Sequence, residues 1–291
     1  MKWQGRRQSR NVIDRRGRGG RGGGAVRLGG AGGLGLLAIV VVGWFLGVDL
    51  TPLLGGSDGG GGYVSQPGSE RPLSAEEEAA GDFAAVTLAD TEEVWSGIFA
   101  EDVGQPYDPS TLVLFSGSTS SACGGASAMT GPFYCPNDER IYLDTQFFTT
   151  LDRQLGAGGD FASAYVIAHE VAHHVQDELG ILSEAQALQS RSSEEQANAI
   201  SVRIELQADC YAGIWARAAE SQLGTIEPGD IAEAMNAAAR IGDDTLQRQS
   251  GGRVRPETFT HGTSEQRQRW FETGYRSGDI TACDTFGASR L

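Results

Sequence analysis

The chain has 291 residues, of which 40% are hydrophobic, so it is long enough for one domain of ordinary size and apolar enough for a packed core. Its net charge of −15 is unevenly distributed, because residues 1–28 hold nine of the 23 basic side chains and one of the 38 acidic ones. The acidic remainder repels nucleic acid and anionic lipid. This excludes a nucleic-acid-binding function for the main domain.

The basic N-terminal segment, residues 1–27, is followed by 21 residues without a charged side chain, from 28 to 48. A helix of roughly 20 residues crosses a bilayer, so residues 28–48 predict one transmembrane helix. The basic flank predicts that the N-terminus stays in the cytoplasm. A cleaved signal peptide and an RNA-binding arm at "RRGRGGRGGG" are the alternatives. The long basic region and the absence of a clear cleavage site favour the uncleaved anchor over the signal peptide.

Residues 49–73 are rich in Gly, Ser and Pro, which predicts a flexible linker, and residues 74–291 form the predicted folded domain. The anchor and the signal peptide both place this domain outside the cytoplasm. Four cysteines in an exported domain indicate two disulfides. We favour Cys123–Cys135 and Cys210–Cys283, although four cysteines allow three connectivities.

The elements of residues 74–291 can be predicted in chain order. Ser74 and Glu77 form a capping box that begins a helix. The run "TLVLFSG" predicts a strand near 111–116, and "GPFYCPNDERIYLD" predicts a hairpin near 133–144. After Gly159 the pattern is helical, in segments at 161–179, 193–220, 229–248 and 264–276. The order predicts one α+β domain, with a small N-terminal sheet and hairpin followed by a helical majority.

Three of the four histidines lie in "HEVAHHV", residues 169–175. On a helix, His169 and His173 project from one face, one turn apart, so both imidazoles can reach one tetrahedral ion. Glu170 can then act as general base on a water activated by that ion. Chance occurrence of H-E-x-x-H on an ordinary helix is the alternative. His174 points about 100° away, beside the site or into the core.

A catalytic zinc needs three protein ligands and one open position. In "RIELQADCYAG", residues 203–213, Glu205 is the candidate third ligand. Asp209 lies one turn later on the same face, where it can bind a ligand imidazole and fix its tautomer. The alternative is that Glu205 and Asp209 are both solvent-exposed charges on the helix surface, without a role in metal binding. His261, in "FTHGTSEQRQRWF", can enter the site and stabilise the oxyanion of peptide hydrolysis, or lie in a surface loop.

Taken together, "MKWQGRRQSRNVIDRRG", "LADTEEVWSGIF", "HEVAHHVQ", "ELQADCYAG" and "THGTSEQRQRWFETGYRSGD" resemble the bacterial putative neutral zinc metallopeptidase family over nearly the whole chain. More distantly, H-E-x-x-H followed by E-x-x-A-D resembles the gluzincins, including HtpX-type membrane endopeptidases. The resemblance implies a zincin-like fold, with zinc on His169, His173 and Glu205. It also implies that Glu170 is the general base and that Asp209 accepts a hydrogen bond from an imidazole that binds the zinc.

These observations predict a membrane-anchored endopeptidase that uses one zinc ion per chain to hydrolyse internal peptide bonds of a peptide or protein substrate. The predicted location is the bacterial cell membrane, as a single-pass protein with the peptidase domain outside the cytoplasm. One alternative is a zinc-stabilised envelope scaffold or chaperone-like module without turnover, which would not need Glu170. A second alternative is an envelope interaction protein without a metal.

Overall fold

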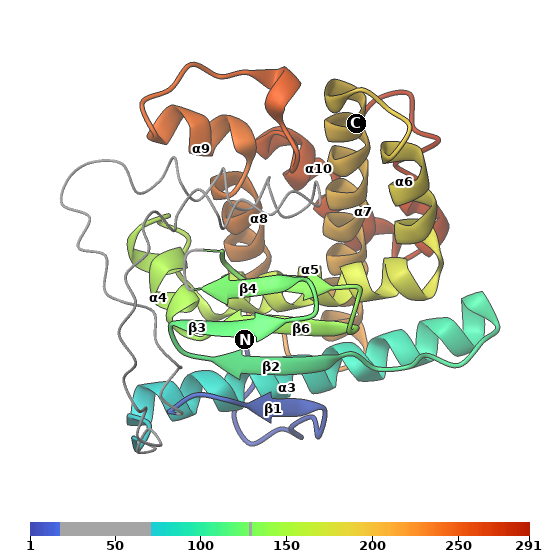
Figure 1. The fold of residues 1–291 in the computed structure, drawn as a ribbon. Helices are drawn as coiled ribbons and strands as arrows, with labels where there is room; N and C mark the ends of the chain where they lie inside the picture. The colour runs from blue at the N-terminus through green and yellow to red at the C-terminus, as the bar shows by residue number, and fades with distance from the viewer. Residues whose placement is uncertain (18–70, 128–129) are drawn as a thin grey trace.

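The computed structural model describes residues 1–17, 71–127 and 130–291 (Figure 1). Helices form the majority of these residues and strands form two small sheets, which confirms the α+β prediction. The predicted transmembrane helix at 28–48 and most of the predicted linker at 49–73 lie outside the described residues. Within the described ranges, no helix combines the length and the apolar character needed to cross a membrane.

The larger sheet has four strands in the order β1-β2-β6-β5. β2 pairs in parallel with both β1 and β6, whereas β5 and β6 form the antiparallel hairpin that the sequence predicts. Their bounds are β1 (Val12–Asp14), β2 (Thr111–Phe115), β5 (Phe133–Cys135) and β6 (Arg140–Asp144). β5 therefore forms the sheet edge opposite to β1.

The two faces of this sheet have different coverings, because side chains alternate along each strand. Leu112 and Leu114 of β2 join the large core shared with the helices. Val113 and Phe115 face the other way and pack with Ala126 of a second, two-stranded sheet. That sheet consists of β3 (Ser118–Ser121) and β4 (Gly124–Ser127). It was not predicted, because its Ser- and Gly-rich strands lack an apolar alternation.

Eight α-helices are present among the described residues, and three of them begin at a capping box, at Ser74, Ser193 and Thr263. The predicted helix at 229–248 is divided in two, because Gly242 lies so close to Ser264 that a Cβ there would come within 2.4 Å of the Ser264 backbone nitrogen. The bounds are α3 (Ala75–Ile98), α4 (Gln146–Arg153), α5 (Asp160–Glu178), α6 (Ile181–Gln189), α7 (Glu194–Ser221), α8 (Asp230–Arg240), α9 (Asp243–Gln249) and α10 (Ser264–Ser277). A π-helical turn, η1 (Phe99–Val103), extends α3, and two 3₁₀ turns are η2 (Pro256–Thr258) and η3 (Ile280–Cys283).

The centre of the molecule is formed by α5, α7 and α10 (Figure 1). α5 is buried along almost its whole length, from Phe161 to Gln176. α7 and α10 approach each other closely at two glycines. A Cβ at Gly274 would lie 1.8 Å from the Cys210 carbonyl oxygen, and one at Gly213 would lie 2.1 Å from the Phe271 carbonyl oxygen. Only glycine permits this contact, which brings the polar groups of the two helices within reach of each other.

The predicted domain boundary needs a correction, because residues 1–17 do not stand apart from the folded domain. Residues 12–14 form β1, and the Asn11 carbonyl accepts a hydrogen bond from the Leu112 N–H. The Met1 side chain is buried, and the Met1 ammonium group lies 2.6 Å from an Asp160 carboxylate oxygen. This packing could not be predicted from the sequence, because a strand of three residues in a basic segment is too short to show a hydrophobic periodicity.

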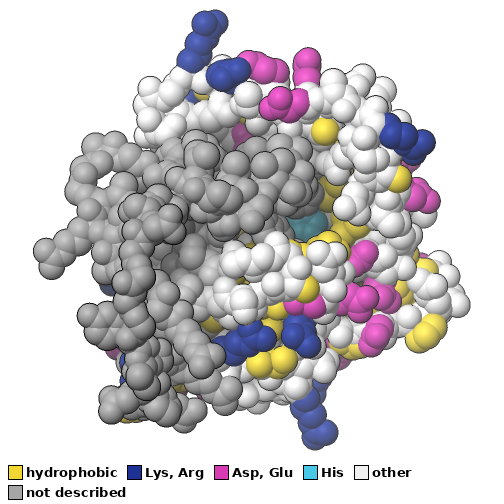
Figure 2. Space-filling view, in the orientation of Figure 1, with side chains coloured by type: hydrophobic (Ala, Val, Ile, Leu, Met, Phe, Trp, Pro, Cys, Tyr) yellow, Lys and Arg dark blue, Asp and Glu magenta, His cyan; other side chains and the backbone are white. Residues whose placement is uncertain are grey.

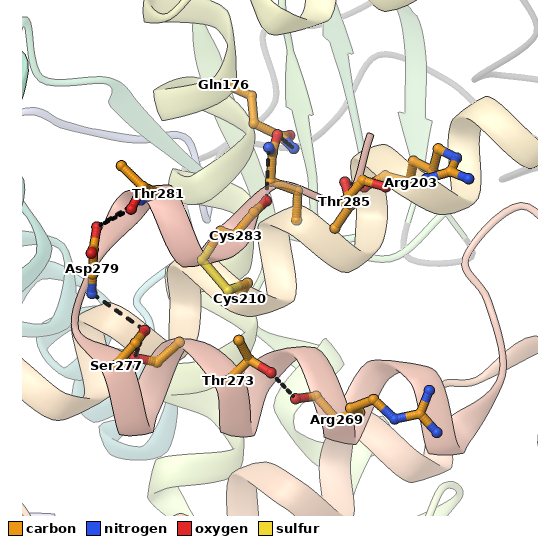
Figure 3. Close-up of a disulfide and its surroundings, with 12 residues drawn as sticks. Gln176, Arg203, Cys210, Arg269, Thr273, Ser277, Asp279, Thr281, Cys283 and Thr285 are labelled. Atoms are coloured by element: carbon orange, nitrogen blue, oxygen red, sulfur yellow. Dashed lines mark hydrogen bonds between the residues drawn. A yellow bond between two sulfur atoms is a disulfide. The ribbon is translucent and has the colours of Figure 1, made fainter. Parts of the chain in front are cut away.

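Both favoured disulfides are formed, and no cysteine is free in the described residues. Cys123–Cys135 links the turn between β3 and β4 to the edge strand β5. Cys210–Cys283 links α7 to the η3 turn (Figure 3). Next to it, the Thr285 hydroxyl donates to the Arg203 carbonyl, so the C-terminal tail is held along α7.

We expect the two disulfides to differ in their effect on stability. Cys210–Cys283 has a sequence separation of 73 and Cys123–Cys135 one of 12. On the chain-entropy account, replacing both cysteines of the longer loop by alanine lowers the free energy of unfolding by about 4 kcal/mol, against about 3 kcal/mol for the shorter loop. Urea unfolding of the two double variants measures both losses. A larger loss from the shorter loop would contradict this expectation.

Candidate metal centre

The predicted ligands meet where α5 packs against α7. His169 and His173 come from α5 and Glu205 comes from α7, and all three residues are less than 9% exposed. Each offers one ligand atom, and these atoms lie within 4.8 Å of one another. In the space-filling view a histidine side chain is visible at the bottom of a hollow (Figure 2). The structure therefore brings together the three residues that the sequence singled out.

The spacing of the donor atoms matches a tetrahedral ion. His169 Nε2 lies 3.1 Å from one Glu205 carboxylate oxygen, and His173 Nε2 lies 3.5 Å from the other. Two ligands of a tetrahedral zinc, each about 2.05 Å from the metal, are separated by about 3.3 Å. The two observed separations lie on either side of that value. These separations, with all three donor atoms within 4.8 Å of one another, are compatible with one zinc ion.

The other nitrogen of each imidazole is already engaged. His169 Nδ1 lies 2.9 Å from an Asp209 carboxylate oxygen, and His173 Nδ1 lies 2.9 Å from the Gln176 amide oxygen. Both acceptors require the proton on Nδ1, which leaves the Nε2 lone pair for a metal. Asp209 therefore has its predicted position behind a ligand. Gln176 has the same role for His173 and was not predicted.

Asp209 is itself held by a buried cation. The guanidinium of Arg267, on α10, donates to both Asp209 carboxylate oxygens over 2.8 and 2.9 Å. Neither side chain has appreciable exposure, and the Tyr165 hydroxyl also donates to Asp209. The charge of Arg267 and the hydrogen bond to His169 overcome the opposing effect of burial and lower the pKa of Asp209. Asp209 is consequently an ionised acceptor in a fixed orientation.

Arg267 was missed at the level of sequence, although a signal for it exists. The buried residues of α10 are Arg267, Trp270, Phe271 and Gly274, at the i, i+3, i+4, i+7 spacing of a helix face directed to the core. An arginine on such a face must pair with an acid.

Glu170 adjoins the ligands and is 8% exposed. Burial is the main cause that raises the pKa of this carboxyl group to about 7, and the negative charge of Glu205 adds to the increase. A hydrogen bond from the backbone N–H of Tyr134 acts in the opposite direction. Since Tyr134 belongs to β5, the carboxyl group lies between the zinc ligands and the edge of the sheet.

His261 lies in the loop before α10, with an Nδ1 atom 3.2 Å from an Asp243 carboxylate oxygen. The other oxygen of Asp243 accepts the backbone N–H groups of residues 260, 261 and 262. Burial lowers the pKa of His261, but the negative charges of Glu205 and Asp243 prevail and raise it. His261 thus lies close enough to Glu205 for the charge of that carboxylate to raise its pKa, and its entry into the site stays a prediction.

His174 does not take part in the ligand set. Its Nε2–H donates to the Asp108 carbonyl oxygen, and its Nδ1 lies 3.1 Å from the Tyr134 hydroxyl group. The side chain is buried, in agreement with the prediction that it points away from the ion. His174 therefore fixes the distance between α5 and the edge strand β5.

Comparison with known proteins gives relatives over the whole length of the chain. Residues 1–286 match the family described as "Putative neutral zinc metallopeptidase". The chain is 49% identical to an Escherichia coli protein named "Uncharacterized protein YpfJ", across 99% of this chain and 100% of the relative. It is 47% identical to the Mycobacterium tuberculosis "Uncharacterized protein Rv2575", across 64% of this chain and 65% of the relative. No solved structure matches the chain.

We expect Asp209→Asn to weaken zinc binding by about 10- to 100-fold, because the neutral amide no longer favours the Nδ1–H tautomer of His169. Competition with a chromophoric chelator measures the affinity. Glu195→Gln is the matched control, since Glu195 is an exposed acid on the same helix. Equal affinity of the Asp209 variant and the wild type would show that Asp209 does not support a ligand.

Proposed function

Since the chain belongs to the putative neutral zinc metallopeptidase family, we propose that it is a zinc-dependent endopeptidase that hydrolyses internal bonds of a peptide or protein. The observation that carries the proposal is the convergence of His169 Nε2, His173 Nε2 and the Glu205 carboxylate. Two imidazoles and one carboxylate form a known ligand set of catalytic zinc, which leaves one position for water or substrate.

One zinc ion per chain would be held by these three residues. When bound, it would acidify a water molecule and polarise the carbonyl group of the scissile bond. Side chains of the protein would carry out the proton transfers and stabilise the oxyanion.

Glu170 is the proposed general base. It accepts the proton of the attacking water and later delivers that proton to the amine that leaves. A carboxyl group with a pKa of about 7 suits both transfers, because the ideal catalytic pKa lies near the working pH. Its place beside the Tyr134 backbone supports a role next to a substrate bound along β5.

His261 is the proposed donor to the oxyanion that forms when the carbonyl is attacked. Asp243 positions it, since the contact with Nδ1 fixes the imidazole and leaves Nε2 free to turn towards the cleft. The three backbone N–H groups that donate to Asp243 hold the whole loop at 260–262 in place. Asp243 acts through His261 and has no contact of its own with the substrate.

The substrate backbone is proposed to add to β5. Two elements predicted from the sequence could offer such an edge, the strand near 111–116 and the hairpin near 133–144. Both sides of β2 are paired, to β1 and to β6. β5 pairs only with β6 among the described strands, and the backbone N–H of Tyr134 in β5 donates to Glu170. An extended peptide could therefore form main-chain hydrogen bonds along β5, with specificity from alternate side chains.

Attachment to the membrane through residues 28–48, with the catalytic domain outside the cytoplasm of a bacterial cell, remains part of the proposal. The two disulfides support an oxidising compartment for the domain. The acidic surface argues against nucleic acid as a partner.

Glu170→Gln tests the central step. We expect hydrolysis of a quenched fluorescent peptide library to fall by about 10²- to 10⁴-fold, because the amide cannot accept the proton of water. Zinc content is expected to stay at the wild-type level. Glu178→Gln, at the C-terminal end of the same helix, is the control. A scaffold without turnover predicts no hydrolysis by the wild type and no difference between the two proteins.

Asp243→Asn tests the positioning of His261. We expect kcat to fall by about 10-fold, and by about 100-fold in His261→Ala, with KM and zinc content unchanged, since the lost interaction acts on the transition state. Asp244→Asn is the matched control, because the neighbouring carboxylate binds Ser264 and not His261. A loss of kcat equal to that of the control would exclude Asp243 from the catalytic arrangement.

A further inference from the structure

Residues 1–17 are attached to the catalytic domain along their whole length. The Lys2 N–H donates to the Thr225 carbonyl, the Ser9 N–H to the Ala85 carbonyl and the Arg15 N–H to the Leu114 carbonyl. Between the last two contacts, β1 pairs in parallel with β2 in the register Val12↔Leu112, Ile13↔Val113 and Asp14↔Leu114. In Figure 1 this strand lies at the edge of the sheet beside β2. We call residues 1–17 the N-terminal strap.

The basic side chains of the strap are used in this packing. Arg6 pairs with Asp90 of α3 over 2.8 Å, and the Asp90 carboxylate is only 4% exposed. The Arg16 side chain is 5% exposed and donates to the Asp14 carboxylate and the Glu77 carbonyl. Arg6 and Arg16 belong to the basic segment that is predicted to lie on the cytoplasmic side of a membrane helix. In the fold Arg6 pairs with Asp90 of the domain, whereas Arg16 pairs with Asp14 of the strap and donates to the Glu77 carbonyl of α3.

The strap also reaches the helix that carries the zinc ligands. The Met1 ammonium group lies 2.6 Å from Asp160, the first residue of α5, and 3.4 Å from Asp230, the first residue of α8. Asp160 and Asp230, with Glu233, place carboxylate oxygens within 4.8 Å of one another. The ammonium group lies beside this cluster of acids, so it reduces the repulsion between their charges.

These contacts conflict with a single membrane crossing between the strap and the domain. A crossing at residues 28–48 would leave residues 1–17 on one side of about 30 Å of hydrocarbon and residues 71–291 on the other. A strand ladder and buried ion pairs require direct contact. We propose that the strap and the catalytic domain lie on the same side of the membrane and fold as one unit. This inference is independent of peptidase activity.

Cysteine accessibility in intact bacterial cells tests the topology with the full chain. Gln8→Cys marks the strap and Gln222→Cys marks the domain, since both side chains are exposed and the native cysteines are paired. A membrane-impermeant maleimide is applied before and after permeabilisation. We expect both positions to react alike, either both before or both only after permeabilisation. Reaction of one position before and of the other only after would overturn the proposal.

A charge exchange tests the docking of the strap separately. Arg6→Asp places two acids together beside α3, and we expect the melting temperature of the purified full chain to fall by about 5 °C. Adding Asp90→Arg should restore at least half of that fall. Arg10→Asp, at an exposed position of the strap, is the control and should leave the melting temperature within about 1 °C. Equal melting temperatures of the Arg6 variant and the control, or no restoration in the double variant, would exclude the contact.

Discussion

The buried pair of Asp209 and Arg267 is the interaction on which the candidate site depends. It joins α7 to α10, and through His169 it fixes the orientation of a residue on α5. Removing two charges from water is costly, and only the complete set of hydrogen bonds around Asp209 offsets that cost. The close approach of α7 and α10 at Gly213 and Gly274 keeps the two charges within hydrogen-bond distance. Stability of the core and geometry of the metal centre are therefore linked in one network.

The same network determines the chemical state of the ligands. With its proton held on Nδ1 by Asp209, the imidazole of His169 offers Nε2 to an ion, and Gln176 does the same for His173. Glu205 completes the set from α7. Glu170 differs from these three, because its carboxyl group is close to the ligands but turned to the backbone of β5. One helix thus provides the two candidate imidazole ligands and the proposed general base.

Much of the site could be predicted from the sequence, because its signals are local. The spacing of His169 and His173 defines one helix face, and Glu205 and Asp209 repeat that spacing on another helix. The distant contacts were harder. The partners of Asp243 are distant in the sequence, because they are the backbone N–H groups of residues 260–262. Only the tertiary structure shows this contact. Arg267 could have been predicted to pair with a buried acid, because it lies on the apolar face of α10.

The packing of the N-terminal strap could not be predicted from local sequence patterns. A basic segment before an apolar run is typical of a membrane anchor, and nothing in its composition indicates that Arg6 and Arg16 pack against α3. The pairing of β1 with β2 joins residues about a hundred positions apart, which no periodicity within a short window can report. The strand near 111–116 was predicted correctly, but its parallel pairing with β1 and β6 was not, because the order of strands in a sheet is a tertiary property.

The zinc content of the full chain, measured beside Glu205→Gln, tests the central claim most directly. Both proteins are purified without chelators, reconstituted with zinc and dialysed against the same zinc-free buffer. The account predicts one zinc per chain in the wild type and loss of that zinc in the variant, since two imidazoles alone do not retain the ion. Zinc absent from both proteins, or retained equally by both, would contradict a metal centre formed by His169, His173 and Glu205.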